Sequence, residues 1–241
     1  MSEKFSPEKM QEVKESEEFE GTVEFSPEEL NSIFTSEKFL ETLSTAAEET
    51  HKSGYETAFE ISVLEEREFV IQNIRKGGTD SMQGEEEIKE VDGMEFFTKK
   101  HGDLLHFHFH PGAEGSVGPS GPDLFIFLDE RAPSFLGIGQ VGEKGRVNIL
   151  LIKRPRKIIT EEDIEDLEES ALWSGGQTAQ TQGEFLYEPS QRDTQDALSK
   201  AGFENFLIRF DRKADGKYKL NKRSQKLLFG LGSARVNLVF P

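Results

Sequence analysis

The sequence predicts an α+β or α/β fold, with a core over residues 36–155 and an extension on either side of it. Three observations support this prediction. Apolar residues follow helical spacing up to residue 54, whereas from residue 58 they fall into short strand-like segments separated by turns. A polar, low-complexity stretch at 174–195 then separates the core from the last part of the chain. The 241 residues, 34% of them hydrophobic, are sufficient for one such core.

Helices are predicted first, before residue 55. The segments Phe5–Glu8 and Phe25–Glu28 both read Phe-Ser-Pro-Glu, in which Ser can cap a helix, Pro suits its first turn and Glu matches its dipole. Each segment therefore predicts a short helix. A longer helix begins at Ser36 and ends near Gly54, because apolar residues recur at helical spacing: Phe39, Leu40, Leu43 and Ala47.

Strands follow the long helix. Residues 58–64 predict a strand, and residues 69–74 predict its hairpin partner across the charged turn at 65–68. The polar, Glu-rich residues 80–93 are expected to form a loop. Residues 94–100 are compatible with either a strand or a short helix.

The second half of the core contains one more strand, a helix and a hairpin. Residues 104–110 alternate as a strand that ends at a proline, and the Gly/Pro/Ser-rich residues 111–122 form a loop. A helix is expected at 123–128, and a closing hairpin is expected from strands at 135–141 and 147–152.

The C-terminal part is predicted to contain an acidic helix that opens at Thr160, then the polar linker, and then a helix, a hairpin and a strand. The hairpin turns at Ala214–Gly216, and the final strand covers residues 236–240. The chain is therefore divided into an acidic N-terminal extension (1–35), a core domain (36–157) and a C-terminal extension with a basic hairpin (158–241).

The composition excludes several kinds of protein. With no cysteine, the chain can form neither disulfides nor thiolate metal sites, and it cannot use a cysteine nucleophile. No apolar run approaches the roughly 20 residues that span a bilayer. The acidic N-terminal segment lacks the apolar stretch of a secretory signal, so a cytoplasmic protein without a membrane partner is expected.

Charge is distributed unevenly along the chain. Residues 1–50 contain 14 acids and 4 lysines, whereas residues 196–241 contain 10 basic residues and 4 acids. We expect two solvated faces that pack against one another, with a basic docking site for an acidic partner as the alternative. The net charge of −17 argues against general nucleic-acid binding, which stays open only at the basic residues of the C-terminal segment.

The five histidines all lie between residues 51 and 110, and three of them read His106-Phe107-His108-Phe109-His110. Residues two apart on a strand share a face, so neighbouring histidines could reach one metal ion. Zinc enzymes commonly use three protein ligands and leave a fourth position open. The nearest candidates for a third ligand are Glu114 and Asp123.

The segment from His108-Phe109-His110-Pro111 to Ser120-Gly121-Pro122-Asp123 resembles the JAMM (JAB/MPN) metalloprotease signature, which is a remote Glu, then H-x-H-P, then S-x-x-D. The order of elements from residue 36 to 155 is also similar, and residues 56–78 look like the RadC branch. Phe109 stands where the family has Ser, Thr or Asn. His110 and Asp123 are separated by 12 residues where the family most often has 10, an insertion with a small entropic cost.

This resemblance implies a JAB/MPN-like mixed sheet flanked by helices over residues 36–157. It also implies zinc held by His108, His110 and Asp123. Glu56 would be the general base and Ser120 the donor to the oxyanion. Glu60 lies on the same strand face and could serve as the base instead; the family's placement favours Glu56 and leaves Glu60 a solvated neighbour. His106 lies on the same face one step deeper in the strand, where we expect a supporting or core role, with a ligand role as the alternative.

The implied activity is zinc-dependent hydrolysis of an amide or isopeptide bond, with a ubiquitin-like protein conjugate on lysine as the substrate. An extended substrate would add to the edge of the strand that ends at His110. One alternative is an MPN-type scaffold in which catalysis is incidental. Another is a cupin-type metal enzyme, because Gly102, His108, His110, Glu114 and Gly121 also match a cupin motif. The oligomeric state is left open.

Overall fold

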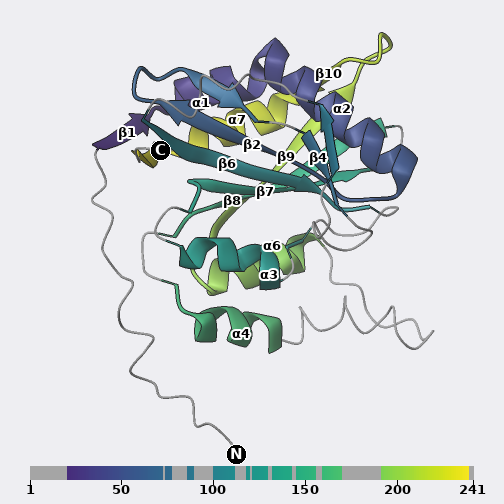
Figure 1. The fold of residues 1–241 in the computed structure, drawn as a ribbon. Helices are drawn as coiled ribbons and strands as arrows, with labels where there is room; N and C mark the ends of the chain where they lie inside the picture. The colour runs from purple at the N-terminus through teal and green to yellow at the C-terminus, as the bar shows by residue number, and fades with distance from the viewer. Residues whose placement is uncertain are drawn as a thin grey trace, which may run out of the picture.

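The fold is mixed α+β, as predicted: a curled mixed sheet lies between two layers of helices in the computed structural model (Figure 1). The structure describes residues 21–72, 74–77, 86–89, 100–111, 118–119, 121–129, 132–142, 145–155, 159–169 and 191–238. Within these residues the strand order is β10-β9-β8-β7-β6-β2-β4-β5, and β3 also pairs with β2.

One helical layer is formed by α1 (Pro27–Thr35), α2 (Glu37–Ser53) and α7 (Lys222–Gly230). The side chain of Ser26 accepts a hydrogen bond from the Glu29 amide, and Glu29 returns one to the Ser26 amide, which completes a capping box. Ser36 caps α2, which ends at the left-handed Gly54. The helices predicted to begin near Ser26 and at Ser36 are confirmed. The helix predicted at Phe5–Glu8 lies outside the described residues.

The centre of the sheet is formed by β2 (Thr57–Leu64), β6 (His101–Phe109), β7 (Phe135–Val141) and β8 (Val147–Lys153). β2 and β6 are antiparallel, β6 and β7 are parallel, and β7 and β8 form the predicted hairpin. All four predicted strands are confirmed, and β6 begins earlier than its expected start at Leu104. β6 therefore has a paired strand on both sides.

The sheet continues beyond β2 with short strands. β3 (Phe69–Ile71) and β4 (Ile74–Lys76) both pair with β2, so the single partner predicted at 69–74 is divided. β5 (Glu86–Lys89) pairs with β4. The loop predicted at 80–93 is therefore wrong at these residues. Main-chain hydrogen bonds hold an edge strand without an apolar face, so the polar sequence carried no strand signal.

The C-terminal segment belongs to the same sheet. β9 (Glu204–Arg212) pairs with β8, and β10 (Tyr218–Leu220) returns from the predicted hairpin turn to pair with β9. β11 (Ala234–Leu238) pairs with β1 (Gly21–Phe25) and packs against β6. The predicted domain boundary at 157 thus falls between two adjacent strands.

The second helical layer consists of α3 (Gly121–Leu124), the 3-10 helix η3 (Phe125–Leu128), α4 (Glu161–Glu169) and α6 (Gln191–Lys200). The helix predicted at 123–128 is confirmed as a short α-helix that tightens into a 3-10 turn. The acidic helix after Thr160 is also confirmed. α6 begins inside the predicted linker, and α7 was not predicted. No helix within the described ranges has the length and apolarity needed to cross a bilayer.

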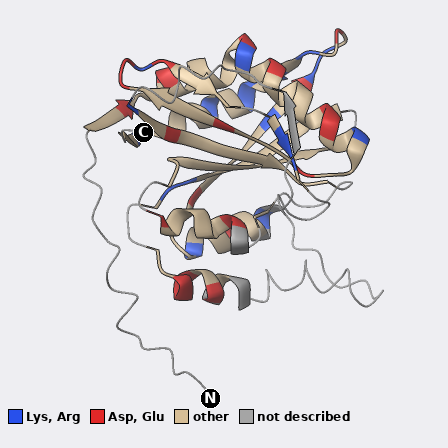
Figure 2. Cartoon of the chain, in the orientation of Figure 1, with Lys and Arg blue, Asp and Glu red and all other residues tan. Residues whose placement is uncertain are grey.

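Described residues of the acidic segment (1–50) and of the basic segment (196–241) meet in the upper layer, which contains many of the Lys and Arg residues, whereas α4 below is acidic (Figure 2). Arg212 contacts Glu48 at 2.9 Å and Lys217 contacts Glu37 at 3.8 Å, so α2 is tied to the β9–β10 hairpin. The expected packing of the two charged segments is confirmed at these contacts. Each exposed pair contributes at most about 1 kcal/mol.

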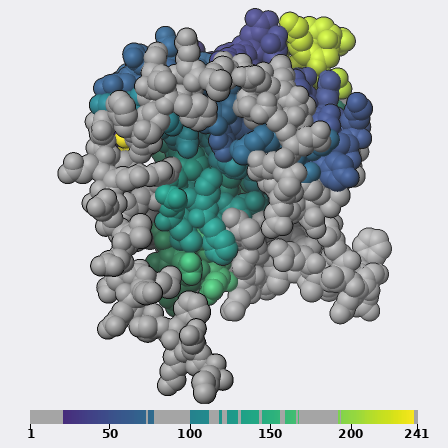
Figure 3. All heavy atoms as spheres, viewed as in Figure 1, coloured from purple at the N-terminus to yellow at the C-terminus, as the bar shows by residue number. Residues whose placement is uncertain are grey.

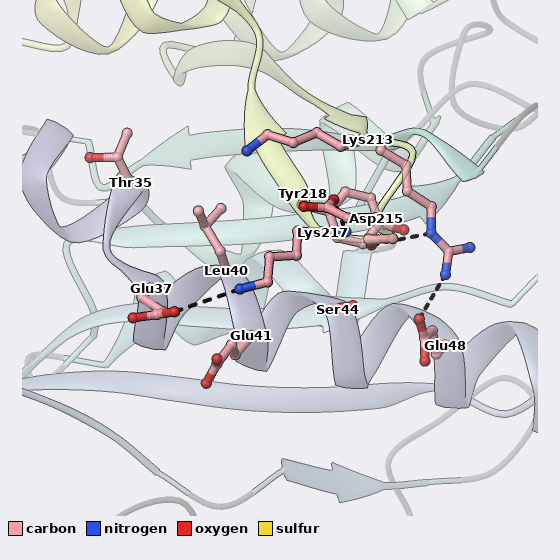
Figure 4. A pocket seen from close by; sticks show the side chains of 12 residues that line it. Thr35, Glu37, Leu40, Glu41, Ser44, Glu48, Lys213, Asp215, Lys217 and Tyr218 are labelled. Atoms are coloured by element: carbon pink, nitrogen blue, oxygen red, sulfur yellow. Dashed lines mark hydrogen bonds and ion pairs between the residues drawn. The ribbon is translucent and has the colours of Figure 1, made fainter.

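A cavity of about 520 Å³ lies between α2 and the hairpin, with these ion pairs across it (Figure 4). Leu40 and Tyr218 contribute apolar surface to it, and Thr35 and Ser44 contribute hydroxyl groups. The cavity has no histidine in its lining, so it is separate from the predicted metal ligands.

Phenylalanine rings from β6 pack directly over glycines of β7. Phe107 and Phe109 are fully buried. A Cβ atom at Gly139 would lie 2.6 Å from Phe107 Cζ and 2.8 Å from the Phe109 ring, and one at Gly137 would lie 2.6 Å from Phe107 Cδ2. These glycines leave the space that the two rings occupy.

We expect Gly139→Ala to lower the free energy of unfolding by about 1–3 kcal/mol, because the added methyl overlaps both rings in a close-packed core. Urea denaturation followed by circular dichroism would measure the change. Gly230→Ala is the matched control, since nothing lies within 4 Å of its added Cβ. Equal stability of the two variants would show that the rings can move aside at no cost.

Candidate metal centre

The predicted ligands are brought together by two elements. His108 lies in β6 and His110 directly follows that strand, while Asp123 lies in α3, the short helix on the path from β6 to β7. The His110 amide donates a hydrogen bond to the Gly139 carbonyl, which extends the pairing of β6 with β7. In the space-filling view, teal atoms from the middle of the chain reach the surface below the blue atoms of the upper helical layer (Figure 3).

The three side chains form a group that could hold a metal ion, with ligand atoms all within 4.8 Å of one another. The Nε2 atoms of His108 and His110 are 3.0 Å apart. Asp123 Oδ1 lies 3.3 Å from His108 Nε2, and its Oδ2 lies 3.7 Å from His110 Nε2. Two ligands bound tetrahedrally at about 2.0–2.1 Å lie about 3.3 Å apart, so these separations suit one small ion.

Glu56 lies beside this group. Its side chain is largely buried just before β2, and its Oε1 is 3.9 Å from His110 Nε2. Glu60 has a different environment, because it is paired with Arg75 at 2.9 Å and with His106 at 3.1 Å. Glu60 is therefore not the solvated neighbour that was expected, and of the two acids Glu56 is the one at the candidate centre.

Protonation also suits a metal centre. The pKa of His110 is lowered from 6.5 to about 4, because burial disfavours its charged form and the neighbouring His108 adds to this, while Asp123 opposes the shift. About 30% of the His110 side chain is exposed, but its Nε2 is directed into the group. A neutral imidazole is the form that binds metals, and nitrogen and oxygen donors are compatible with zinc.

The other predicted residues have varied outcomes. Ser120 and Glu114 lie outside the described residues. Phe109 points into the core, on the opposite face of β6 from its two histidine neighbours. Of the two histidines outside the run at 106–110, His51 is exposed on α2.

Arg75 is a charged residue near the site that the sequence analysis missed. It lies in β4 and contacts Glu60. The alignment of β4 against β2 places Arg75 beside Glu60, and that alignment cannot be predicted from the spacing of residues in the sequence.

Comparisons with known proteins found no match to a protein-family model, to a curated protein or to a solved structure. The chemistry of the chain must therefore be argued from the site itself.

We expect about one divalent metal ion per chain, and expect His108→Ala, His110→Ala and Asp123→Ala each to lose it, because two remaining ligands hold an ion weakly. Elemental analysis after dialysis would measure metal content. His51→Ala is the control and should keep the ion. Full metal content in all three ligand variants would exclude this group as the binding site.

We also expect the metal-free protein to lose stability as the pH falls from about 6.5 to about 4. The unfolded chain takes up a proton on His110 near pH 6.5, whereas the folded chain resists until about pH 4, so acid favours unfolding. Between pH 7 and pH 5 this histidine should account for a loss on the order of 1 kcal/mol. Urea titrations of the wild type and of His110→Asn would show it as the difference between their pH dependences; parallel curves would contradict it.

Proposed function

We propose that the chain is a zinc-dependent hydrolase of the JAB/MPN type that cleaves an amide or isopeptide bond. The observation that supports this most is the convergence of His108, His110 and Asp123 with the buried carboxylate of Glu56 beside them. Three ligands leave a coordination position open for catalysis, and the fourth side chain is an acid of the kind that serves as a general base.

Both departures from the family pattern are compatible with this proposal. The Phe109 ring is buried in the core, so its apolar character does not alter the surface around the ligands. The longer separation between His110 and Asp123 still lets the Asp123 carboxylate approach His108 within 3.3 Å. The complete set of ligands and base favours an enzyme over a scaffold, which would need none of them.

Each protein group has a defined task in the proposed reaction. Zinc, when bound, would polarise the scissile carbonyl and lower the pKa of a water to about 7. Glu56 accepts a proton from the attacking water, whose oxygen bonds to the carbonyl carbon. Glu56 then gives that proton to the amine as the carbon–nitrogen bond breaks. Ser120 would donate a hydrogen bond to the oxyanion, a role that rests on the family resemblance alone.

The approach of the substrate differs from the sequence-based expectation. From Leu105 to Phe109, β6 is paired with β2 on one side and with β7 on the other, so this part of the strand has no free edge. Strand addition at β6 is therefore wrong. We propose instead that an extended tail reaches the site over the face that bears His108 and His110. A Gly-Gly tail of a ubiquitin-like modifier suits such an approach, because glycine lets the backbone come close.

We expect Glu56→Gln to retain the metal and the fold but to reduce turnover by about 10²–10⁴-fold, since the amide cannot accept the proton. Metal analysis and initial rates would be measured together. Glu65→Gln, at an exposed turn position, is the control and should keep its rate. Unchanged turnover in Glu56→Gln would remove Glu56 from the mechanism.

The substrate class is tested with zinc-loaded protein and Gly-Gly-ε-lysine conjugates, with unrelated peptides in parallel. We expect cleavage after the terminal glycine, which mass spectrometry would detect as free lysine side chains, and expect a zinc chelator to stop it. If the protein binds zinc but cleaves no conjugate, the isopeptidase proposal fails while the metal centre stands.

A further inference from the structure

His106 shares the strand face of the metal group without belonging to it. The ladder between β2 and β6 sets Glu60 directly opposite His106. Glu60 Oε1 accepts a hydrogen bond from Arg75 Nη2 at 2.9 Å, and the same oxygen lies 3.1 Å from His106 Nδ1. Two strands and an arginine from a third thus fix one histidine ring.

The partner of His106, Glu60, determines which ring nitrogen of the histidine donates a hydrogen bond. Burial raises the pKa of Glu60, but its contacts with His106 and Arg75 outweigh burial and hold the pKa below its usual value. An ionised carboxylate can only accept hydrogen bonds. His106 Nδ1 must therefore carry a proton, which it donates to Glu60 Oε1.

The metal ligand His108 lacks the usual outer support. A histidine that binds metal through one ring nitrogen normally donates the other N–H to a carboxylate or carbonyl, which sets the orientation of the ring. His108 turns Nε2 toward the group, and its Nδ1 is buried with no hydrogen-bond partner among the residues that the structure describes. Across its two ladders it faces the apolar side chains of Ala58 in β2 and Ile138 in β7. The orientation of the ring must therefore come from packing.

His106 supplies the ring contact in that packing. Its ring contacts the His108 ring edge-on, with centroids 5.9 Å apart and planes at 61°. The other ring neighbour, His110, is itself a member of the metal group. We propose that Glu60 and His106 are positioning residues that hold the His108 imidazole in its metal-binding orientation, with Arg75 balancing the charge of Glu60. This inference rests on the proposed metal site and adds the device that orients one of its ligands.

The experiment compares Glu60→Gln and His106→Ala with a matched control, Asp103→Asn. Asp103 is a partly buried acid of β6 that accepts a hydrogen bond from Ser62 of β2 at 2.6 Å, whereas Glu60 is paired with His106. Metal affinity is measured by competition, and the visible spectrum of the cobalt-loaded protein reports ligand geometry. We expect about 10–100-fold weaker binding and an altered cobalt spectrum in the first two variants, and wild-type values in the control.

A second measurement needs no metal. Long-range ¹⁵N–¹H correlation spectra of the metal-free protein should show His106 with its proton on Nδ1, and Glu60→Gln should change that signal. Urea denaturation of each variant checks that it is folded.

The outcomes separate this inference from the proposed function. Wild-type metal affinity and cobalt spectra in Glu60→Gln and His106→Ala would overturn the positioning role, even if the protein hydrolyses its conjugates. Equal losses in Asp103→Asn would also overturn it, because they would reflect a general effect of removing a buried charge. Tight binding that depends on Glu60 and His106, without hydrolysis of any substrate, would support the positioning pair and refute the hydrolase.

Discussion

The alternation of side chains along β6 is the constraint on which the rest of the structure depends. Phe107 and Phe109 point into the core, and the histidines between and beside them point to the opposite face. A slip of one residue would put imidazoles in the core and phenylalanines at the site. The close fit of the two rings over Gly137 and Gly139 prevents such a slip, so core packing sets the positions of the metal ligands.

Local features of the fold could be predicted from the sequence, and long-range register could not. The ends of α1 and α2 could be predicted at Ser26, Ser36 and Gly54, because capping depends only on a few neighbouring residues. The edge strand β5 gave no such signal. The pairing of Glu60 with His106 depends on how two distant strands align, including an irregularity after Ile61. The candidate ligands were predictable because His108 and His110 are two residues apart on one strand, and because the spacing to Asp123 resembles a known signature.

Gly102 shows how a motif can match for an unrelated physical reason. It completes the cupin-like pattern, but a Cβ atom there would lie 2.1 Å from the carbonyl oxygen of Asn237 in β11. A glycine is required at this position because another strand crosses it closely. Residues beyond β8 also extend the sheet and supply β11, so the C-terminal segment contributes to the support of the strand that bears the histidines.

The pairing of β1 with β11 has a consequence for how the protein is made. Thr22 and Asn237 meet across 215 residues of chain, so this two-stranded unit cannot close until β11 has left the ribosome. Until then, the beginning of β6 lacks the cover that β11 gives it. Contacts so distant in sequence form late and slow folding. A nascent chain therefore completes the support of its histidine strand only after β11 has been synthesised, and premature termination before residue 234 would leave that strand exposed to aggregation.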